Sequence, residues 1–195
     1  MKTLVIGAGP GGYVAAIRAA ELGQEVTVVE KNRVGGVCLN EGCIPSKALY
    51  QVAQQFYNAN HTDCTIGIET HEATLHFDKT QKWKEGIVTQ LTEGVQFLFN
   101  KHHIQLLEGT ATLRDSHHAT VTLKAGTTEE LSFDHVIIAT GSRPIMLADF
   151  PKSPRVLDST GLMNLPQLPD HLVVIGGVAL SVQNWQRSII DSAVV

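Results

Sequence analysis

The chain has 195 residues, of which 43% are hydrophobic and 17% are charged, and its formal net charge is −4. This composition is ordinary for a globular protein, and the length suits one large domain or one domain and part of another. The slight negative charge argues against a nucleic-acid or anionic-membrane surface, because both need clustered lysine and arginine. No apolar run is long enough to span a bilayer, and no secretory peptide precedes the strand-like segment Lys2–Gly7. We therefore expect a cytoplasmic protein.

The N-terminal segment predicts a strand–helix–strand unit. Thr3–Ile6 has the apolar character of a buried strand, Gly11–Leu22 is an alanine-rich helix, and Glu25–Glu30 is a second strand. The unit has the size expected for a right-handed parallel crossover.

Glycines punctuate the turn between that first strand and its helix, at Gly7, Gly9 and Gly12. In this spacing the first glycine permits the tight turn, the second lets the backbone approach a pyrophosphate, and the third lets helix and strand pack closely. Glu30 ends the second strand, where a carboxylate can accept the ribose hydroxyls of an adenosine. The spacing alone is weak evidence, but the strands, helix and terminal acid together predict a dinucleotide site.

Two cysteines, Cys38 and Cys43, follow in the segment GGVCLNEGCIPSK. Two buried, inert thiols are the alternative to a reactive pair, but the flanking glycines and Pro45 favour an exposed turn that leads into a helix. Zinc would need four ligands, and Cys64 has no paired motif nearby. A dithiol beside a bound dinucleotide is the arrangement that passes electrons between sulfur and a flavin, so we favour redox chemistry.

A helix is predicted from near Cys43 or Ser46 to Asn58, with Pro45 tolerated in its first turn. The N-terminus of a helix favours the thiolate form of a cysteine, which is the form that attacks disulfides. Lys47 follows one helical turn after Cys43 and is either a solvated helix residue or a cation near the thiolate and the flavin.

A second long helix is predicted over Asp78–Lys101, with Asp78 as its cap. Its expected apolar stripe comprises Trp83, Ile87, Leu91, Val95 and Leu98. We expect Trp83, Phe97 and Phe99 to be helix-packing residues.

From residue 104 the apolar period changes to two, which predicts short antiparallel strands at Ile104–Leu107, Thr110–Leu113, Ala119–Leu123 and Glu130–Phe133. His135–Ala139 then returns as a buried strand, and the proline-rich segment Met146–Pro169 is expected to be a linker. Leu172–Ile175, followed by Gly176 and Gly177, has the pattern of a second nucleotide-binding strand and turn.

These elements predict an α/β fold, namely a Rossmann-like dinucleotide-binding domain with a parallel sheet and a small antiparallel β insertion. We expect that domain over residues 1–148, a linker over 149–171 and the start of a second nucleotide-binding domain over 172–195. A metal site is not expected. The adjacent pairs His102–His103 and His117–His118 lie at loop or strand edges, and neighbours on a strand point to opposite faces.

The sequence resembles the dihydrolipoamide dehydrogenases, which are flavin-dependent pyridine nucleotide–disulfide oxidoreductases. The resemblance rests on VIGAGPGGYVAAIRAAELG, on GGVCLNEGCIPSK and on ATGSRP, and it extends from Lys2 to about Gly177. Glutathione and mercuric reductases look similar but favour valine at the positions of Leu39 and Ile44.

The resemblance implies a role for each matched residue. Cys38 would be the interchange thiol that attacks a lipoyl disulfide, Cys43 the thiolate stacked on the flavin, and Lys47 the cation that steadies the flavin ring. FAD would be held by Gly7, Gly9, Gly11, Gly12 and Glu30, and largely through backbone contacts by Gly36, Ala111, Thr140 and Gly141. The reaction would be oxidation of the dihydrolipoyl group of a 2-oxo acid dehydrogenase complex or the glycine cleavage system, with NAD⁺ as final acceptor, in a homodimer.

Departures from the family qualify this expectation. Family members are more than twice as long, and they continue through an NAD domain and a dimerisation domain that supplies a catalytic His–Glu pair. Residues 178–195 lack the glycine and acid expected after Gly176 and Gly177, which we interpret as a frameshifted or non-native tail. We therefore expect the polypeptide itself to be inactive. A related disulfide or mercuric reductase and a non-catalytic FAD-binding fragment remain as alternatives.

Overall fold

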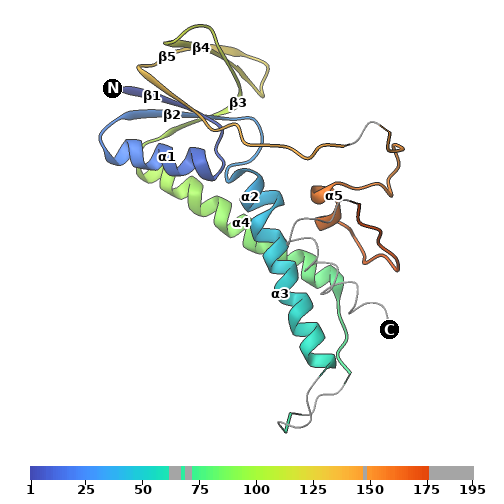
Figure 1. Ribbon diagram of the computed structural model, residues 1–195. Coiled ribbons are helices and arrows are strands. Elements are labelled where there is room, and N and C mark those ends of the chain that lie inside the picture. Colours follow the sequence, from blue (N-terminus) through green and yellow to red (C-terminus); the bar gives the residue numbers. More distant parts are fainter. Residues whose placement is uncertain (62–66, 69–71, 147–148, 176–195) are drawn as a thin grey trace.

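The computed structural model describes residues 1–61, 67–68, 72–146 and 149–175 (Figure 1). Within that part, six strands form one mixed sheet in the order β5-β4-β3-β2-β1-β6. Strands β1 (Lys2–Ile6), β2 (Glu25–Glu30) and β6 (His135–Ile138) pair in parallel, and the first half of β3 (Gln105–Leu113) extends this parallel part. The predicted α/β fold with a parallel sheet is confirmed.

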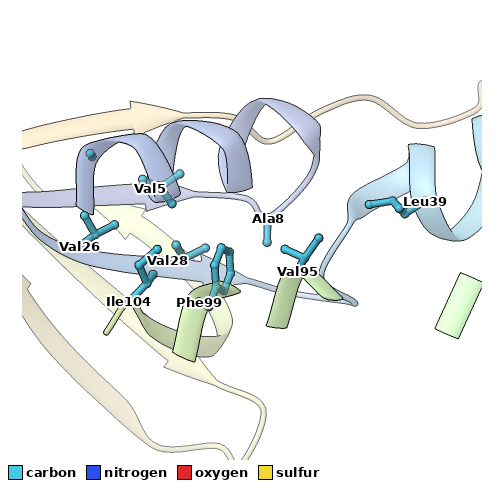
Figure 2. Close-up of a cluster of buried hydrophobic side chains, with 10 residues drawn as sticks. Val5, Ala8, Val26, Val28, Leu39, Val95, Phe99 and Ile104 are labelled. Atoms are coloured by element: carbon cyan, nitrogen blue, oxygen red, sulfur yellow. The ribbon is translucent and has the colours of Figure 1, made fainter. Parts of the chain in front are cut away.

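The two faces of the parallel sheet are covered differently. Val5 and Val28 point to a face covered by helices α1 (Pro10–Glu21) and α4 (Phe77–Lys101), where Phe99 and Val95 complete the cluster (Figure 2). Side chains alternate along a strand, so Leu4 and Val29 point to the opposite face, where they pack against β4 (His118–Leu123). The core therefore consists of a helical layer, the parallel sheet and an antiparallel layer.

Strand β3 joins the two kinds of sheet. Residues 105–108 pair in parallel with β2, whereas residues 109–113 pair antiparallel with β4, which in turn pairs with β5 (Thr128–Ser132). Gly109 lies where the partner changes, and a Cβ there would be 2.3 Å from the Thr122 carbonyl oxygen. The antiparallel insertion is confirmed, but the prediction of two separate antiparallel strands over 104–113 was wrong, because this glycine lets one strand continue past the crossing.

Helix α4 confirms the predicted long helix but not its buried face. Its buried residues include Lys84, Val88, Val95 and Phe99, whereas Trp83 is 48% exposed. Leu91 and Phe97 are also exposed. The predictions that Val95 lies on the buried stripe and that Phe99 packs against the core are confirmed. The predictions for Trp83, Leu91 and Phe97 were wrong, and a buried lysine faces inward in place of the tryptophan. Asp78 is not the cap either: it lies in the first turn, after the N-cap residue His76.

Two helices were not expected. Helix α2 (Gly36–Glu41) precedes α3 (Cys43–Asn60), and α3 and α4 then run side by side away from the sheet (Figure 1). Helix α5 (Ser159–Met163) interrupts the expected linker.

The C-terminal strand expected at Leu172–Ile175 is not formed, although the structure describes these four residues. A strand depends on ladder hydrogen bonds to a neighbour, and no described strand lies beside this segment. Val173 is 84% exposed and Ile175 is 68% exposed.

Candidate functional site

The turn after β1 needs glycine at two of its positions. Gly7 has φ of 101°, and a Cβ there would lie 2.3 Å from the Ala139 carbonyl oxygen. A Cβ on Gly12 would lie 1.8 Å from the Gly7 carbonyl oxygen. Helix α1 can therefore begin against the end of β1 only because both residues lack a side chain.

Glu30 lies against the same turn. It is 8% exposed, and the Ala8 N–H donates to its Oε2 at 2.7 Å. The Asn32 N–H donates to Oε1 at 2.8 Å. The carboxylate is therefore fixed beside the glycine turn by two backbone donors, at the carboxyl end of β2.

The segment after β6 lies at the same edge of the sheet. The Ala139 N–H donates to the Ile6 carbonyl at 2.8 Å, which aligns Thr140 and Gly141 with the end of β1. Gly141 has φ of 69°, and a Cβ there would contact nothing within 4 Å. Ala111 belongs instead to the antiparallel half of β3, where it pairs with Val121 and packs on the second cluster.

These features fit the pyrophosphate-containing cofactor that the sequence implies. Gly9 and Gly11 leave backbone uncovered at the start of α1: a Cβ on Gly11 would meet only the Ala139 methyl, at 3.9 Å. The N-terminus of α1 carries free N–H groups and a partial positive charge, which suit phosphate oxygens. A fixed carboxylate at the end of β2 suits ribose hydroxyls.

The cysteines lie on the next two helices. Cys38 is half-buried in α2, and Cys43 is exposed as the first residue of α3. Gly42 separates the helices, and a Cβ on it would lie 3.0 Å from the Val37 carbonyl oxygen and 3.4 Å from the Cys38 Cα. The glycine therefore allows the chain to turn sharply and bring the second cysteine back beside the first.

The two thiols interact directly. A hydrogen bond to the Cys43 sulfur raises the pKa of Cys38, with further increases from burial and from the negative charge of an ionised Cys43. A hydrogen bond from the Cys43 backbone N–H and, to a smaller extent, the charge of the Lys47 ammonium oppose this increase in pKa. In such a dithiol, Cys38 retains its proton while its partner accepts the hydrogen bond.

The cysteine helix abuts the glycine turn. Gly36, the first residue of α2, has φ of 58°, and a Cβ there would lie 2.6 Å from the Gly9 Cα. The Gly35 N–H also donates to the Ala8 carbonyl at 2.8 Å. The structure therefore brings together the predicted dinucleotide turn and the predicted dithiol through direct backbone contact.

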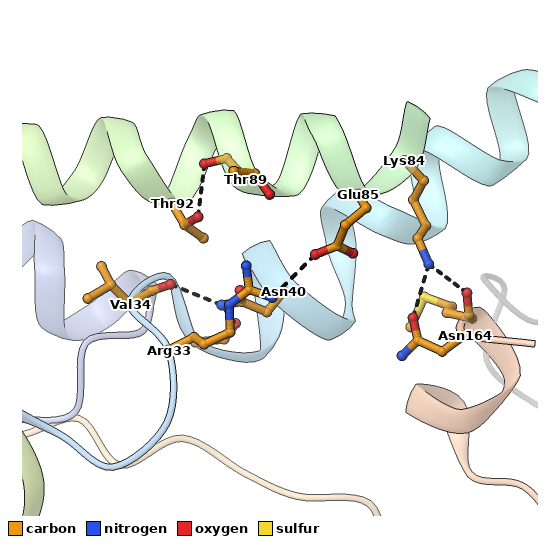
Figure 3. Close-up of polar contacts among 10 residues, drawn as sticks. Arg33, Val34, Asn40, Lys84, Glu85, Thr89, Thr92 and Asn164 are labelled. Atoms are coloured by element: carbon orange, nitrogen blue, oxygen red, sulfur yellow. Dashed lines mark hydrogen bonds and ion pairs between the residues drawn. The ribbon is translucent and has the colours of Figure 1, made fainter. Parts of the chain in front are cut away.

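Asn40 is a residue of this site that sequence analysis missed. Its Nδ2 donates to the Val34 carbonyl at 3.0 Å and to the Gly36 carbonyl at 2.9 Å, which closes the loop before α2 (Figure 3). The feature of the sequence that could have pointed to Asn40 is its position between Cys38 and Cys43.

Three further expectations concern metals, membranes and residues outside the described ranges. No cluster of three or more His, Cys, Asp or Glu side chains able to hold a metal occurs in the described residues. None of the helices in that part of the chain has both the length and the apolar character required to cross a membrane. Cys64, Gly176 and Gly177, and the tail 178–195, lie outside the described residues.

Residues 1–183 match the family model for pyridine nucleotide-disulphide oxidoreductases, so the chain belongs to this flavoenzyme family. It is 48% identical over 182 residues to a dihydrolipoyl dehydrogenase of Geobacillus stearothermophilus, matching 93% of this chain and 38% of that protein. It is 52% identical over 175 residues to a dihydrolipoyl dehydrogenase of Bacillus subtilis, matching 90% of this chain and 37% of that protein. The chain thus spans less than two fifths of the length of these relatives.

Solved structures agree with this assignment. The HOCl-induced flavoprotein disulfide reductase RclA of Escherichia coli superimposes with a TM-score of 0.80 at 26% identity, over 100% of this chain and 40% of that one. The predicted Rossmann-like FAD-binding fold and the expected family are therefore confirmed. The roles of individual site residues stay predictions.

Proposed function

We propose that the chain supplies the FAD-binding and dithiol part of a dihydrolipoyl dehydrogenase. The observation that carries the proposal is the backbone contact between Gly36 and Gly9, which joins the helix of Cys38 to the glycine turn. The similarity to two dihydrolipoyl dehydrogenases supports the choice of substrate class. In this proposal residues 1–148 form the FAD-binding domain, 149–171 the connection, and 172–195 the start of an NAD-binding domain, of which 178–195 are a frameshifted or non-native tail.

The cofactor would be held by the residues that line the turn. Backbone groups of Gly9, Gly11 and Gly12 would bind the pyrophosphate at the N-terminus of α1, and Glu30 would bind the ribose hydroxyls. Backbone groups of Gly7, Gly36, Ala111, Thr140 and Gly141 would add contacts. Bound FAD would supply the redox chemistry that links the dithiol to NAD⁺.

The cysteines would carry out the exchange with substrate. With the pair oxidised, one thiolate of a dihydrolipoyl group attacks the Cys38 sulfur, the Cys38–Cys43 bond breaks, and Cys43 leaves as a thiolate. The second dihydrolipoyl thiol then attacks the first substrate sulfur and releases Cys38. One disulfide bond forms in the substrate as one is lost in the protein, so two electrons pass to the cysteine pair. The proton of the second substrate thiol passes to Cys38, and that of the first is released to solvent when the attacking thiolate forms, which leaves Cys43 as a thiolate.

The charges around the pair suit this division of roles. Cys43 is the more exposed sulfur and lies at a helix N-terminus, where the partial positive charge of the helix favours an anion. Lys47 lies one turn along the same helix and adds a positive charge. Cys38, whose pKa is raised, would be the sulfur that remains protonated when the pair is reduced.

The physiological partner would be the dihydrolipoyl group of a 2-oxo acid dehydrogenase complex or of the glycine cleavage system, with a second copy of the enzyme completing a homodimer. A related disulfide reductase is the competing function, because RclA shares the fold.

Mass spectrometry of the chain mixed with lipoamide tests the proposal without relying on turnover. The reduced chain should lose two hydrogens between Cys38 and Cys43 as lipoamide is reduced, and a Cys38→Ser variant should not form this bond. If lipoamide leaves the pair reduced whereas a general thiol oxidant closes it, the dihydrolipoyl substrate is wrong and the disulfide-reductase alternative is favoured.

A further inference from the structure

Lys84 is a buried cation that the proposed exchange does not use. It is 3% exposed and lies on the inner face of α4. Burial lowers its pKa, and the nearby Glu85 carboxylate opposes that change. A buried ammonium is costly unless acceptors surround it, so its partners indicate what the position is for.

Those partners belong to α5 and the residues just after it. The Nζ of Lys84 donates to the Met163 carbonyl at 2.8 Å and to Asn164 Oδ1 at 3.0 Å (Figure 3). One turn earlier on α4, the Nε2 of Gln81 donates to the Met163 and Leu165 carbonyls at 3.2 and 3.0 Å. We call these five residues the α4–α5 clasp.

The clasp supplies hydrogen-bond donors to the C-terminal end of α5. A five-residue helix is too short to be stable alone. The N–H groups of Asn164 and Leu165 bond back to the Gly161 and Leu162 carbonyls, and the clasp supplies donors to the next carbonyl, that of Met163. A cation at that end also complements the negative end of the helix dipole. At the other end, the Asp158 side chain caps the helix by accepting from the Gly161 N–H at 2.8 Å.

Helix α5 also touches the helix that carries Cys38. Thr160 Oγ1 donates to Glu41 Oε2 at 3.4 Å, and Glu41 is the last residue of α2. The two helices are packed together. Helix α2 is only six residues long and ends at a glycine, and α5 adds to the contacts that it makes with α3 and α4.

We propose that Lys84 is a positioning residue for the dithiol: by holding α5 against α2 through the clasp, it fixes the place of Cys38 relative to Cys43. The inference rests on the proposed function only in taking Cys38 and Cys43 as the redox pair. It assigns to a lysine outside the cysteine motif an influence on how readily that pair closes into a disulfide.

The test compares Lys84→Met with Lys82→Met, the same change at an exposed position of the same helix. Two quantities are measured on the whole chain: hydrogen exchange of the peptide covering 156–166, and the equilibrium between the dithiol and the disulfide in a glutathione buffer. Lys84→Met should speed exchange in that peptide at least tenfold, leave the peptides of β1 and β2 unchanged, and shift the thiol–disulfide equilibrium severalfold. Lys82→Met should change neither.

Each other result overturns the inference in a defined way. Faster exchange with an unaltered thiol–disulfide equilibrium would make the clasp merely structural, and a shifted equilibrium without faster exchange would exclude α5 as the route. If Lys84→Met does not fold, Gln81→Met removes the two bonds from Gln81 to the Met163 and Leu165 carbonyls while leaving the lysine, and it must produce the same two effects at smaller size. Failure of the wild-type pair to react with lipoamide would refute the proposed substrate but would leave both readouts of the clasp intact.

Discussion

Adding one methyl group at Gly12 should unfold the start of α1. The new Cβ would lie 1.8 Å from the Gly7 carbonyl oxygen and 2.8 Å from the Gly7 carbonyl carbon. Ordinary contact begins at about 3.5 Å, so helix and strand would have to separate by about 1.7 Å. Both sides of the contact are backbone, so no side chain can rotate away.

The expected cost follows from these distances. Overpacking a well-packed site costs about 1–3 kcal/mol, and a backbone clash of this depth belongs at the upper end. Alanine is favoured over glycine within a helix by about 1 kcal/mol, which offsets part of the loss. We therefore expect Gly12→Ala to lower the free energy of unfolding by about 2 kcal/mol or more, and to abolish binding of FAD.

Urea denaturation followed by circular dichroism measures this change, and Gly94→Ala is its matched control. Gly94 lies within α4, where a Cβ would meet nothing within 4 Å. The same substitution should there raise stability by about 0.5–1 kcal/mol. The reasoning is refuted if Gly12→Ala unfolds at the same urea concentration as the unsubstituted chain, or if the two variants change stability in the same direction.

Three further substitutions have defined outcomes. His103 follows α4 with a φ of 56°, and its N–H and that of Ile104 bond back to the helix. His103→Gly should therefore add about 0.5–1 kcal/mol to the free energy of unfolding. An unchanged melting temperature would argue against backbone strain at this residue. Cys43→Ala removes the main cause of the raised pKa of Cys38. The pH midpoint for alkylation of Cys38 should therefore fall toward the ordinary pKa of 9.0. An unchanged midpoint would mean that the two thiols do not interact. The pKa of Lys84 is lowered in the folded chain, so the folded chain binds fewer protons than the unfolded chain between that pKa and 10.5. The contribution of Lys84 to the free energy of unfolding therefore rises with pH across this interval. Lys84→Met should remove this part of the pH dependence of stability, measured by urea denaturation at a series of pH values.

The sequence predicted the parallel sheet well because local and long-range preferences agree there. β2 has the predicted bounds, and the glycines at 7 and 12 occupy positions that only glycine can fill. The parallel pairing of β1 with β6, far apart in the chain, fits the expected returning strand. The prediction that this strand is buried was wrong, because β6 lies at the edge of the sheet and Ile138 is 64% exposed.

Other features depended on tertiary contacts that periodicity does not encode. Lys84 is buried because carbonyls of α5 surround it, so a search for apolar residues placed the inner face of α4 on Trp83 instead. Helices α2 and α5 are short and gain their stability from neighbours, so their sequences carry little helical signal. The spacing of Cys38 and Cys43 predicted that the two thiols lie close enough to interact, whereas the contact of Gly36 with Gly9 depends on how two distant loops pack.

The most direct test of the central claim is the visible absorption spectrum of the purified chain with FAD, recorded before and after addition of dihydrolipoamide, with Cys43→Ser beside it. The account predicts a bound yellow flavin and a new long-wavelength band from the Cys43 thiolate on reduction, which Cys43→Ser would lack. A chain that takes up no FAD, or a band that persists in Cys43→Ser, would contradict it.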